Sequence, residues 1–160
     1  MLECEFVEIE PICVLAVRHI GPYNECGKAW ERMMKYAYTQ KIKLKKNLMG
    51  KSARMFGVGY DNPNVVEASK LRCDVCITKD DDVVLEDGIR EMVISGGRFA
   101  RFLHKGPYEA LAEKYVQIYG IWMAENSIMP REEPPFEEYL NRDPRRTKPQ
   151  NLRTHIYIPI

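Results

Sequence analysis

The residues best suited to chemistry are one glutamate and the aromatic side chains around it. Glu137 and Tyr139 alternate along one short strand-like segment, and His155 and Tyr157 alternate along the last segment of the chain. Side chains two positions apart on a strand share a face. If the isoleucines of the last segment pack on helices, His155 and Tyr157 face the open side of a sheet. We expect Glu137 and Tyr139 to join them there.

Phe56 or Tyr60, from the first half of the chain, would complete a groove with aromatic walls and one carboxylate. Aromatic faces attract flat apolar molecules and cations. A lone carboxylate in a poorly hydrated groove is costly, and a lipophilic cation recovers part of that cost by pairing with it. The pattern therefore favours bulky, flat, often cationic compounds as ligands.

A plainer interpretation of the same residues stays open at this point. Aromatic side chains on strands are most often part of the core, and Glu137 or Glu138 could be an ordinary solvated edge residue. Spacing alone does not decide between a groove and a packed core, because a pocket is a property of three-dimensional structure.

One short motif occurs twice and shows how the chain is organised. His-Ile-Gly-Pro-Tyr occupies residues 19–23, and His-Lys-Gly-Pro-Tyr occupies residues 104–108, with each shared residue 85 positions apart. Each copy ends an apolar strand-like run and precedes an amphipathic helix-like run. His19 and His104 could form a catalytic pair, but a repeated imidazole that serves the same turn in each half explains the pattern more simply.

The remaining periodicities predict a strand, a helix and two strands in each half. The first helix begins near Asn24 and ends near Thr39. The second begins at Gly106, carries an unusually aromatic stripe and ends before Pro130. The expected strands cover residues 12–19, 55–60, 71–79, 92–104, 136–140 and 154–160. The region 92–104 is interrupted at Gly96 and Gly97, where a bulge or bend is expected.

We predict an α+β fold in which tandem, pseudo-twofold βαββ repeats form one antiparallel-rich sheet. Both helices cover one face of the sheet, and a ligand cleft lies on the other face. Antiparallel sheets tolerate one open face, whereas parallel sheets rarely do. Residues 1–160 are expected to form one domain, with repeats at about 5–80 and 90–160.

Composition excludes several classes of function. The net charge is +1, so no electrostatic footprint indicates direct binding of nucleic acid or of an anionic membrane, and the basic segments 41–51 and 142–148 are expected to be solvated loops. No apolar stretch approaches the length of a membrane span. The N-terminus lacks a secretory signal and the five cysteines are odd in number, which predicts a cytoplasmic protein with free thiols.

No cofactor or metal is expected. Cys73 and Cys76 lie three apart on a strand, so they point to opposite faces and do not share a metal. Residues 80–82 are three aspartates without the pattern of a calcium loop. The motifs of dinucleotide, phosphate-loop, zinc-protease and serine-hydrolase sites are missing.

Several motifs in order resemble the GyrI-like small-molecule-binding domain, which also forms the effector-binding half of AraC-type and MerR-type regulators. The resemblance covers almost the whole chain. The matching segments are residues 17–23 with Trp30, 60–63, 97–100, 104–108, Tyr119-Gly-Ile-Trp122, 135–140 with 143–144, and 155–159.

The resemblance implies a tandem fold with a ligand cleft along the pseudo-dyad. It implies that Glu137, in Phe-Glu-x-Tyr, meets cationic ligands among aromatics that include Tyr119, Trp122 and Tyr157. His155 stands where relatives carry a second acid, which weakens the expected preference for cations. The implied ligand-binding set is Glu137, Tyr139, Trp122, Tyr157, His155, Phe56, Tyr60 and Tyr119.

Three functions follow from the resemblance. The first is a stand-alone binder of hydrophobic, drug-like molecules that sequesters xenobiotics or senses an effector, because the first expected strand leaves no room for a preceding DNA-binding motif. The second is a hydrolase of cyclopropane-bearing toxins, with Glu137 as general base and Tyr139 or Tyr157 as hydrogen-bond donor. The third is a protein-binding inhibitor of DNA gyrase or a partner of a regulator. An exposed sheet edge could also pair two chains.

Overall fold

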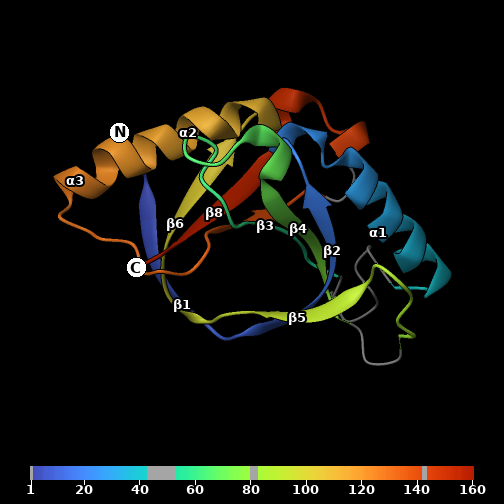
Figure 1. Cartoon of the computed structure of the whole chain (residues 1–160). Coiled ribbons are helices and arrows are strands. Elements are labelled where there is room, and N and C mark those ends of the chain that lie inside the picture. The colour runs from blue at the N-terminus through green and yellow to red at the C-terminus, as the bar shows by residue number, and fades with distance from the viewer. Residues whose placement is uncertain (1, 43–52, 80–82, 142–143) are drawn as a thin grey trace. The chain divides into compact units, whose positions relative to one another are not determined.

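The computed structural model describes residues 2–42, 53–79, 83–141 and 144–160. It confirms the α+β class, with antiparallel sheets and helices (Figure 1). Contacts divide the chain into two compact units. Residues 10–96 form the internal unit, while the two ends of the chain, up to residue 9 and from residue 97, form the terminal unit.

The internal unit is a four-stranded antiparallel sheet covered on one face by a helix. In sheet order the strands are β3 (Met55–Gly59), β4 (Arg72–Thr78), β2 (Ile12–Ile20) and β5 (Arg90–Ile94). The helix α1 (Gly27–Thr39) buries Ala29, Met33, Tyr36 and Ala37, whose spacing of three and four forms one stripe. This stripe packs on alternate residues of the sheet, namely Leu15, Val17, Val75 and Ile77.

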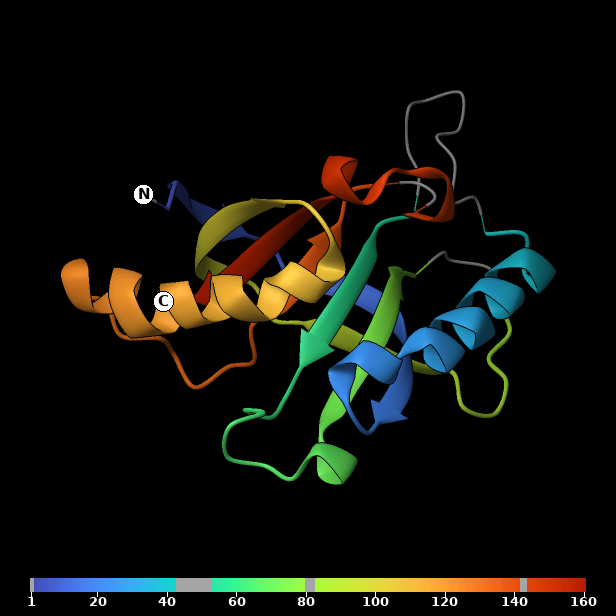
Figure 2. The same cartoon turned by 90° about the horizontal axis from the view of Figure 1, so that it is seen from above.

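The terminal unit repeats this plan with β1 (Cys4–Ile9), β6 (Gly97–Lys105), β8 (Arg153–Pro159) and β7 (Phe136–Tyr139), in that sheet order. Its helical run lies along one face of the sheet (Figure 2). The run consists of α2 (Leu111–Gln117), a π-helical turn (Ile118–Trp122) and the short α3 (Met123–Glu125). The core between the helical run and the sheet contains Ala100, Phe102, Leu111, Ile118, Trp122, Met123, Ile156 and Ile158.

The repeated motif forms the same turn in both units. His19 Nε2 lies 2.9 Å from the Pro22 carbonyl oxygen, and His104 Nε2 lies 3.0 Å from that of Pro107. The intervening glycines have φ of 133° and 135°, a conformation that L side chains rarely adopt. The structural interpretation of the two histidines is therefore confirmed, because each imidazole ties its own turn.

One detail of the strand prediction was wrong, because the polar-rich segment Cys4–Ile9 is a strand that the alternation did not reveal. The interruption expected at Gly96 and Gly97 divides the region 92–104 into two strands, β5, which ends at Ile94, and β6, which begins at Gly97. The first strand of each half also pairs outside its own repeat. β1 pairs with β6 in the terminal unit, and β5 pairs with β2 in the internal unit.

Some expectations lie wholly or partly outside the described residues. The aspartates 80–82 lie wholly outside them. The basic segment 41–51 lies outside them from residue 43 onward, and the segment 142–148 lies outside them at residues 142 and 143. Within the described part of the chain, no helix is both long and apolar enough to cross a membrane. The same residues hold no group of three or more side chains suited to a metal ion, and all five cysteines are free thiols.

Candidate functional site

Glu137 lies on the helix-covered face of the terminal sheet. The register places Glu137 opposite Ile156, whose side chain is fully buried in the core beneath the helical run. Directly opposed residues of neighbouring strands share a face. The expectation that Glu137 and Tyr139 join His155 and Tyr157 on the open face was therefore wrong. The error arose because the faces of β7 and β8 were matched without knowing the register between them.

Two phenols hold the Glu137 carboxylate. The Tyr115 hydroxyl, from α2, donates to Oε1 at 2.9 Å, and the Tyr139 hydroxyl, from the same strand as Glu137, donates to Oε2 at 2.7 Å. Each carboxylate oxygen thus has one hydrogen bond from a neutral donor. This arrangement fixes the direction of the carboxylate without neutralising its charge.

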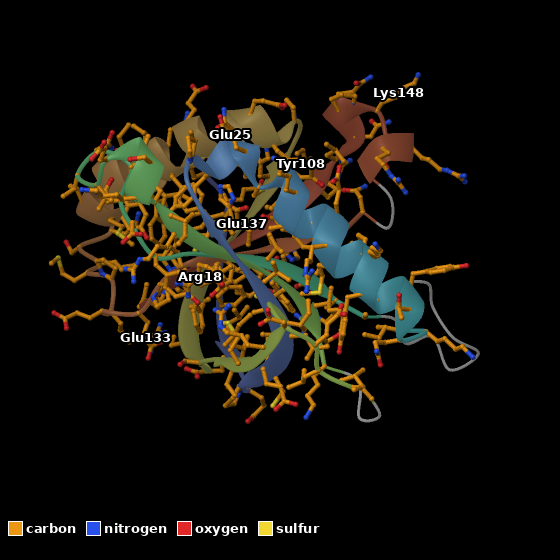
Figure 3. All side chains as sticks on the ribbon, turned by 45° about the vertical axis from the view of Figure 1, so that its right-hand side comes forward. Arg18, Glu25, Tyr108, Glu133, Glu137 and Lys148 are labelled. Atoms are coloured by element: carbon orange, nitrogen blue, oxygen red, sulfur yellow. The ribbon has the colours of Figure 1, made fainter. Side chains whose placement is uncertain are left out.

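Two further tyrosines contact the rings of the two phenols that bond to this carboxylate. The Tyr108 ring meets the Tyr139 ring edge-on, with centroids 5.5 Å apart and an interplanar angle of 77°. The Tyr119 ring is nearly parallel to that of Tyr115, with centroids 6.3 Å apart. We call Glu137 with these four tyrosines the Glu137 site; Figure 3 labels Glu137 and Tyr108, both from the terminal unit.

Burial raises the pKa of the Glu137 carboxyl. The hydrogen bonds from Tyr139 and Tyr115 and the nearby His104 oppose this shift without cancelling it. No lysine or arginine among the described residues pairs with Glu137. Among the described residues the carboxylate is therefore desolvated and not paired with a lysine or arginine, yet its side chain is only partly buried. A cation that reached it would stabilise its charged form.

The helical run has an irregularity at this site. The π-helical turn begins at Ile118, directly before Tyr119, and it ends at Trp122. Ile118 and Trp122 are buried, while Tyr119 remains 41% exposed. Single π-helical turns inside α-helices are frequent at functional sites. Here the turn anchors the helix by two buried residues and leaves an exposed ring beside Tyr115.

Tyr157 and His155 lie on the opposite face of the terminal sheet. Tyr157 is 3% exposed and stacks on Phe136, with centroids 4.5 Å apart and an interplanar angle of 11°. The Tyr157 hydroxyl donates to Glu138 Oε1 at 3.2 Å. The His155 ring meets the Tyr157 ring edge-on, with centroids 6.1 Å apart. Of the two phenols expected to assist Glu137 in hydrolysis, only Tyr139 is in place.

The remaining expected site residues each make other contacts within their own unit. Trp122 is buried beneath the helical run, with its ring edge-on to Phe102 at 4.9 Å. Phe56 is fully buried in the internal unit. Tyr60, also in the internal unit, donates its hydroxyl to Asp74. For Trp122, Tyr157 and Phe56, the structure favours the packing role that was the plainer interpretation of the sequence.

Sequence reasoning did not assign Tyr108, Tyr115, His104 or Thr154 to the site. Tyr115 and Tyr119 are four apart, a spacing that makes helical side chains neighbours, and this signal could have identified the pair. Thr154 lies between His104 and Tyr139 in the register, and its buried hydroxyl has no hydrogen-bond partner among the described residues. No sequence signal marks that hydroxyl.

The chain belongs to the GyrI-like small-molecule-binding domain family, whose model matches residues 2–160. Among curated proteins it is similar to a DNA gyrase inhibitor of Citrobacter koseri, with 25% identity over 89% of this chain and 92% of that protein.

The fold is shared with solved structures of low identity. One is the EcmrR C-terminal domain, with a TM-score of 0.79, 20% identity, and coverage of 99% of this chain and 97% of that one. Another is SAV2435 bound to tetraphenylphosphonium, with a TM-score of 0.65, 14% identity, and coverage of 99% and 93%. At these identities the likeness concerns the fold.

Proposed function

We propose that the chain binds hydrophobic, cationic small molecules at the Glu137 site, and thereby sequesters them or senses them as effectors. The observation that carries the proposal is a desolvated carboxylate bonded by two phenols, with no lysine or arginine paired to it among the described residues. A lipophilic cation supplies the missing charge, and the tyrosine rings supply apolar and cation–π contacts.

Family membership supports the same conclusion. The family is defined by small-molecule binding. The fold is shared with SAV2435, which is described as bound to tetraphenylphosphonium, a bulky aromatic cation. That compound has the charge and the aromatic surface that the Glu137 site is suited to receive.

The test compares a cation with a neutral molecule of similar shape. Titration calorimetry with tetraphenylphosphonium and with triphenylphosphine oxide should show tighter binding of the cation. Glu137→Gln keeps the shape of the side chain and removes its charge, so we expect cation affinity to fall by about 1–3 kcal/mol while the neutral compound binds equally. Equal cation affinity in wild type and in Glu137→Gln would remove this carboxylate from the binding site.

Glu138→Gln is the matched control. Glu138 is the next residue of β7 and lies on the opposite sheet face, where Tyr157 donates to it. We expect this variant to keep the cation affinity of wild type. A loss in Glu138→Gln and not in Glu137→Gln would move the binding site to the other face.

The curated relatives favour a second candidate, inhibition of DNA gyrase through a protein interface. A supercoiling assay with purified gyrase tests it directly. Inhibition that persists in Glu137→Gln and in the presence of saturating tetraphenylphosphonium would separate a protein-binding surface from the Glu137 site. Absence of inhibition at any ratio of the two proteins would reject this candidate.

A further inference from the structure

A second buried acid lies in the internal unit and has opposite surroundings. Asp74, on β4, is completely buried. Arg18 of β2 binds it with two hydrogen bonds, Nε to Oδ1 at 2.9 Å and Nη2 to Oδ2 at 3.2 Å. Arg90 of β5 also donates to Oδ2, as does the Tyr60 hydroxyl at 2.5 Å. We call these four residues the Asp74 cluster.

The Asp74 cluster carries one positive charge in excess. Two guanidinium groups meet one carboxylate, and no second carboxylate among the described residues pairs with Arg18 or Arg90. Arg72, which also lies over the Tyr60 ring, is neutralised by its own pair with Asp61. The Cys76 thiol, near Asp74 on the same strand, stays uncharged because burial raises its pKa.

Neutrality of Asp74 does not require both arginines. Arg18 already binds Asp74 in the two-point geometry that matches a guanidinium to a carboxylate. Arg90 adds a second cation that bonds to the same oxygen, so two like charges are held close together. Such repulsion costs free energy, and a second anion beside both guanidiniums would relieve it.

Both arginines remain accessible. The side chains of Arg18 and Arg90 are 37% and 40% exposed, although their shared partner has no exposed surface. A guanidinium has five N–H donors, and Asp74 takes two from Arg18 and one from Arg90. The planar guanidinium is the side chain best matched to carboxylate and phosphate groups. Figure 3 labels Arg18.

We propose that Arg18 and Arg90 form a binding site for a small carboxylate or phosphate anion in the internal unit. Asp74 and Tyr60 position the two guanidiniums, and the anion binds their remaining N–H donors. This site lies outside the terminal unit and selects a charge opposite to that of the ligand proposed for the Glu137 site. Failure of one binding proposal would therefore leave the other unaffected.

The test uses the full chain, with acetate and inorganic phosphate as probes, monitored by the arginine Nε–H resonances in NMR spectra. We expect saturable shifts at Arg18 and Arg90 in wild type, with the tighter probe showing whether carboxylate or phosphate is preferred. Arg90→Met removes the surplus cation and leaves the Arg18–Asp74 pair, so the dissociation constant should rise about tenfold or more.

Arg98→Met is the matched control, because Arg98 is an exposed arginine of the terminal unit that lies over Phe6. It should leave anion affinity unchanged. If neither probe gives saturable shifts at Arg18 and Arg90 in wild type, the proposal is overturned, whatever the variants do. Equal binding by wild type and Arg90→Met would overturn it as well.

Discussion

The two units treat a buried acid in opposite ways. In the terminal unit, the described residues that bond to Glu137 are neutral phenols, and burial raises its pKa. In the internal unit, burial alone would raise the pKa of Asp74, but the bonds from Arg18, Arg90 and Tyr60 outweigh burial and hold its pKa below the ordinary value. Among the described residues, Glu137 has no lysine or arginine paired to it, whereas Asp74 is paired with two arginines. Two buried carboxyl groups therefore give sites that are suited to ligands of opposite charge.

The register shows where the units diverge. His19 pairs with Cys73, and β3 places Gly59 opposite that same residue. In the terminal unit, Thr154 of β8 corresponds to Cys73, because it pairs with His104, and it lies opposite Tyr139. Gly57 and Gly59 therefore occupy the places of Glu137 and Tyr139, so the helix-covered face of β3 has no side chains there.

The motif tyrosines follow this difference. Tyr23 lies over Gly59, and its hydroxyl bonds to the main chain of Asp61. Tyr108 instead meets the ring of Tyr139. The same turn thus places a structural tyrosine in one unit and a tyrosine of the Glu137 site in the other. Residues of the strand β7 and of the helical run, and not the turn itself, therefore create the Glu137 site.

The largest effect is expected from removing Asp74. Asp74→Ala leaves two adjacent guanidiniums unpaired, and we expect the free energy of unfolding to fall by about 2 kcal/mol or more, less than for a fully buried pair because both arginines are partly exposed. Glu137→Gln should change it by less than about 1 kcal/mol, because no ion pair is lost. Urea denaturation measures both. Equal losses of unfolding free energy in the two variants would mean that Asp74 and Glu137 do not differ in their contribution to stability.

A smaller effect is expected when pH changes the charge of Glu137. Its pKa is raised above the ordinary carboxyl value of 4.5, so the protonated form persists to higher pH in the folded chain. Affinity for tetraphenylphosphonium should therefore increase as the pH rises through the pKa of Glu137, and decrease as the pH falls through it. Calorimetry across this range checks the effect. A flat profile in wild type, like that expected for Glu137→Gln, would contradict it.

The same raised pKa has a consequence for stability. A carboxyl that binds its proton more tightly in the folded state favours folding at low pH, and this contribution is lost as the pH rises from 4.5 through the folded pKa. Asp74 behaves oppositely, because its lowered pKa favours folding above the ordinary aspartate value of 3.8 and the contribution is lost at lower pH. Comparing the pH dependence of unfolding in Glu137→Gln and in wild type isolates the Glu137 contribution.

The smallest effects should come from the paired histidines. His19→Phe and His104→Phe each remove one bond to a proline carbonyl, so each should cost about 1 kcal/mol of unfolding free energy. Of the two histidines, His104 is the one that lowers the pKa of Glu137, so His104→Phe and not His19→Phe should raise that pKa further, as measured by carbon NMR of the Glu137 carboxyl. If both substitutions move the pKa of Glu137 equally, the distinction between the two turns is lost.

Much of the fold followed from patterns that act locally. The glycine–proline turns, the helix stripe that ends at Thr39 and the isoleucines of the last strand all indicated their elements, because each depends on neighbours along the chain. The strand Cys4–Ile9 was missed because its polar residues obscure the alternation. Its partner, β6, is about 90 residues away, a pairing that no local pattern shows.

The candidate site was predictable only in part. Glu137 and Tyr139 were identified as a pair from their alternation on one strand, and the structure joins them by a hydrogen bond. The rest of the site depends on register and helix packing. A shift of one residue reverses every side chain of a strand, so the choice between Tyr157 and Tyr115 as a neighbour of Glu137 required the pairing of β7 with β8.

Because β1 pairs with β6 and β5 pairs with β2, the internal unit could be removed from the chain as one continuous segment. Ile9, at the end of β1, lies opposite Gly97, at the start of β6, and Ile12 likewise lies opposite Ile94. A hairpin turn of about two residues could therefore join residues 9 and 97 and excise everything between them. The shortened polypeptide would retain every residue of the Glu137 site, whereas a cut between β4 and β5, where the two repeats meet in the sequence, would deprive each fragment of an edge strand.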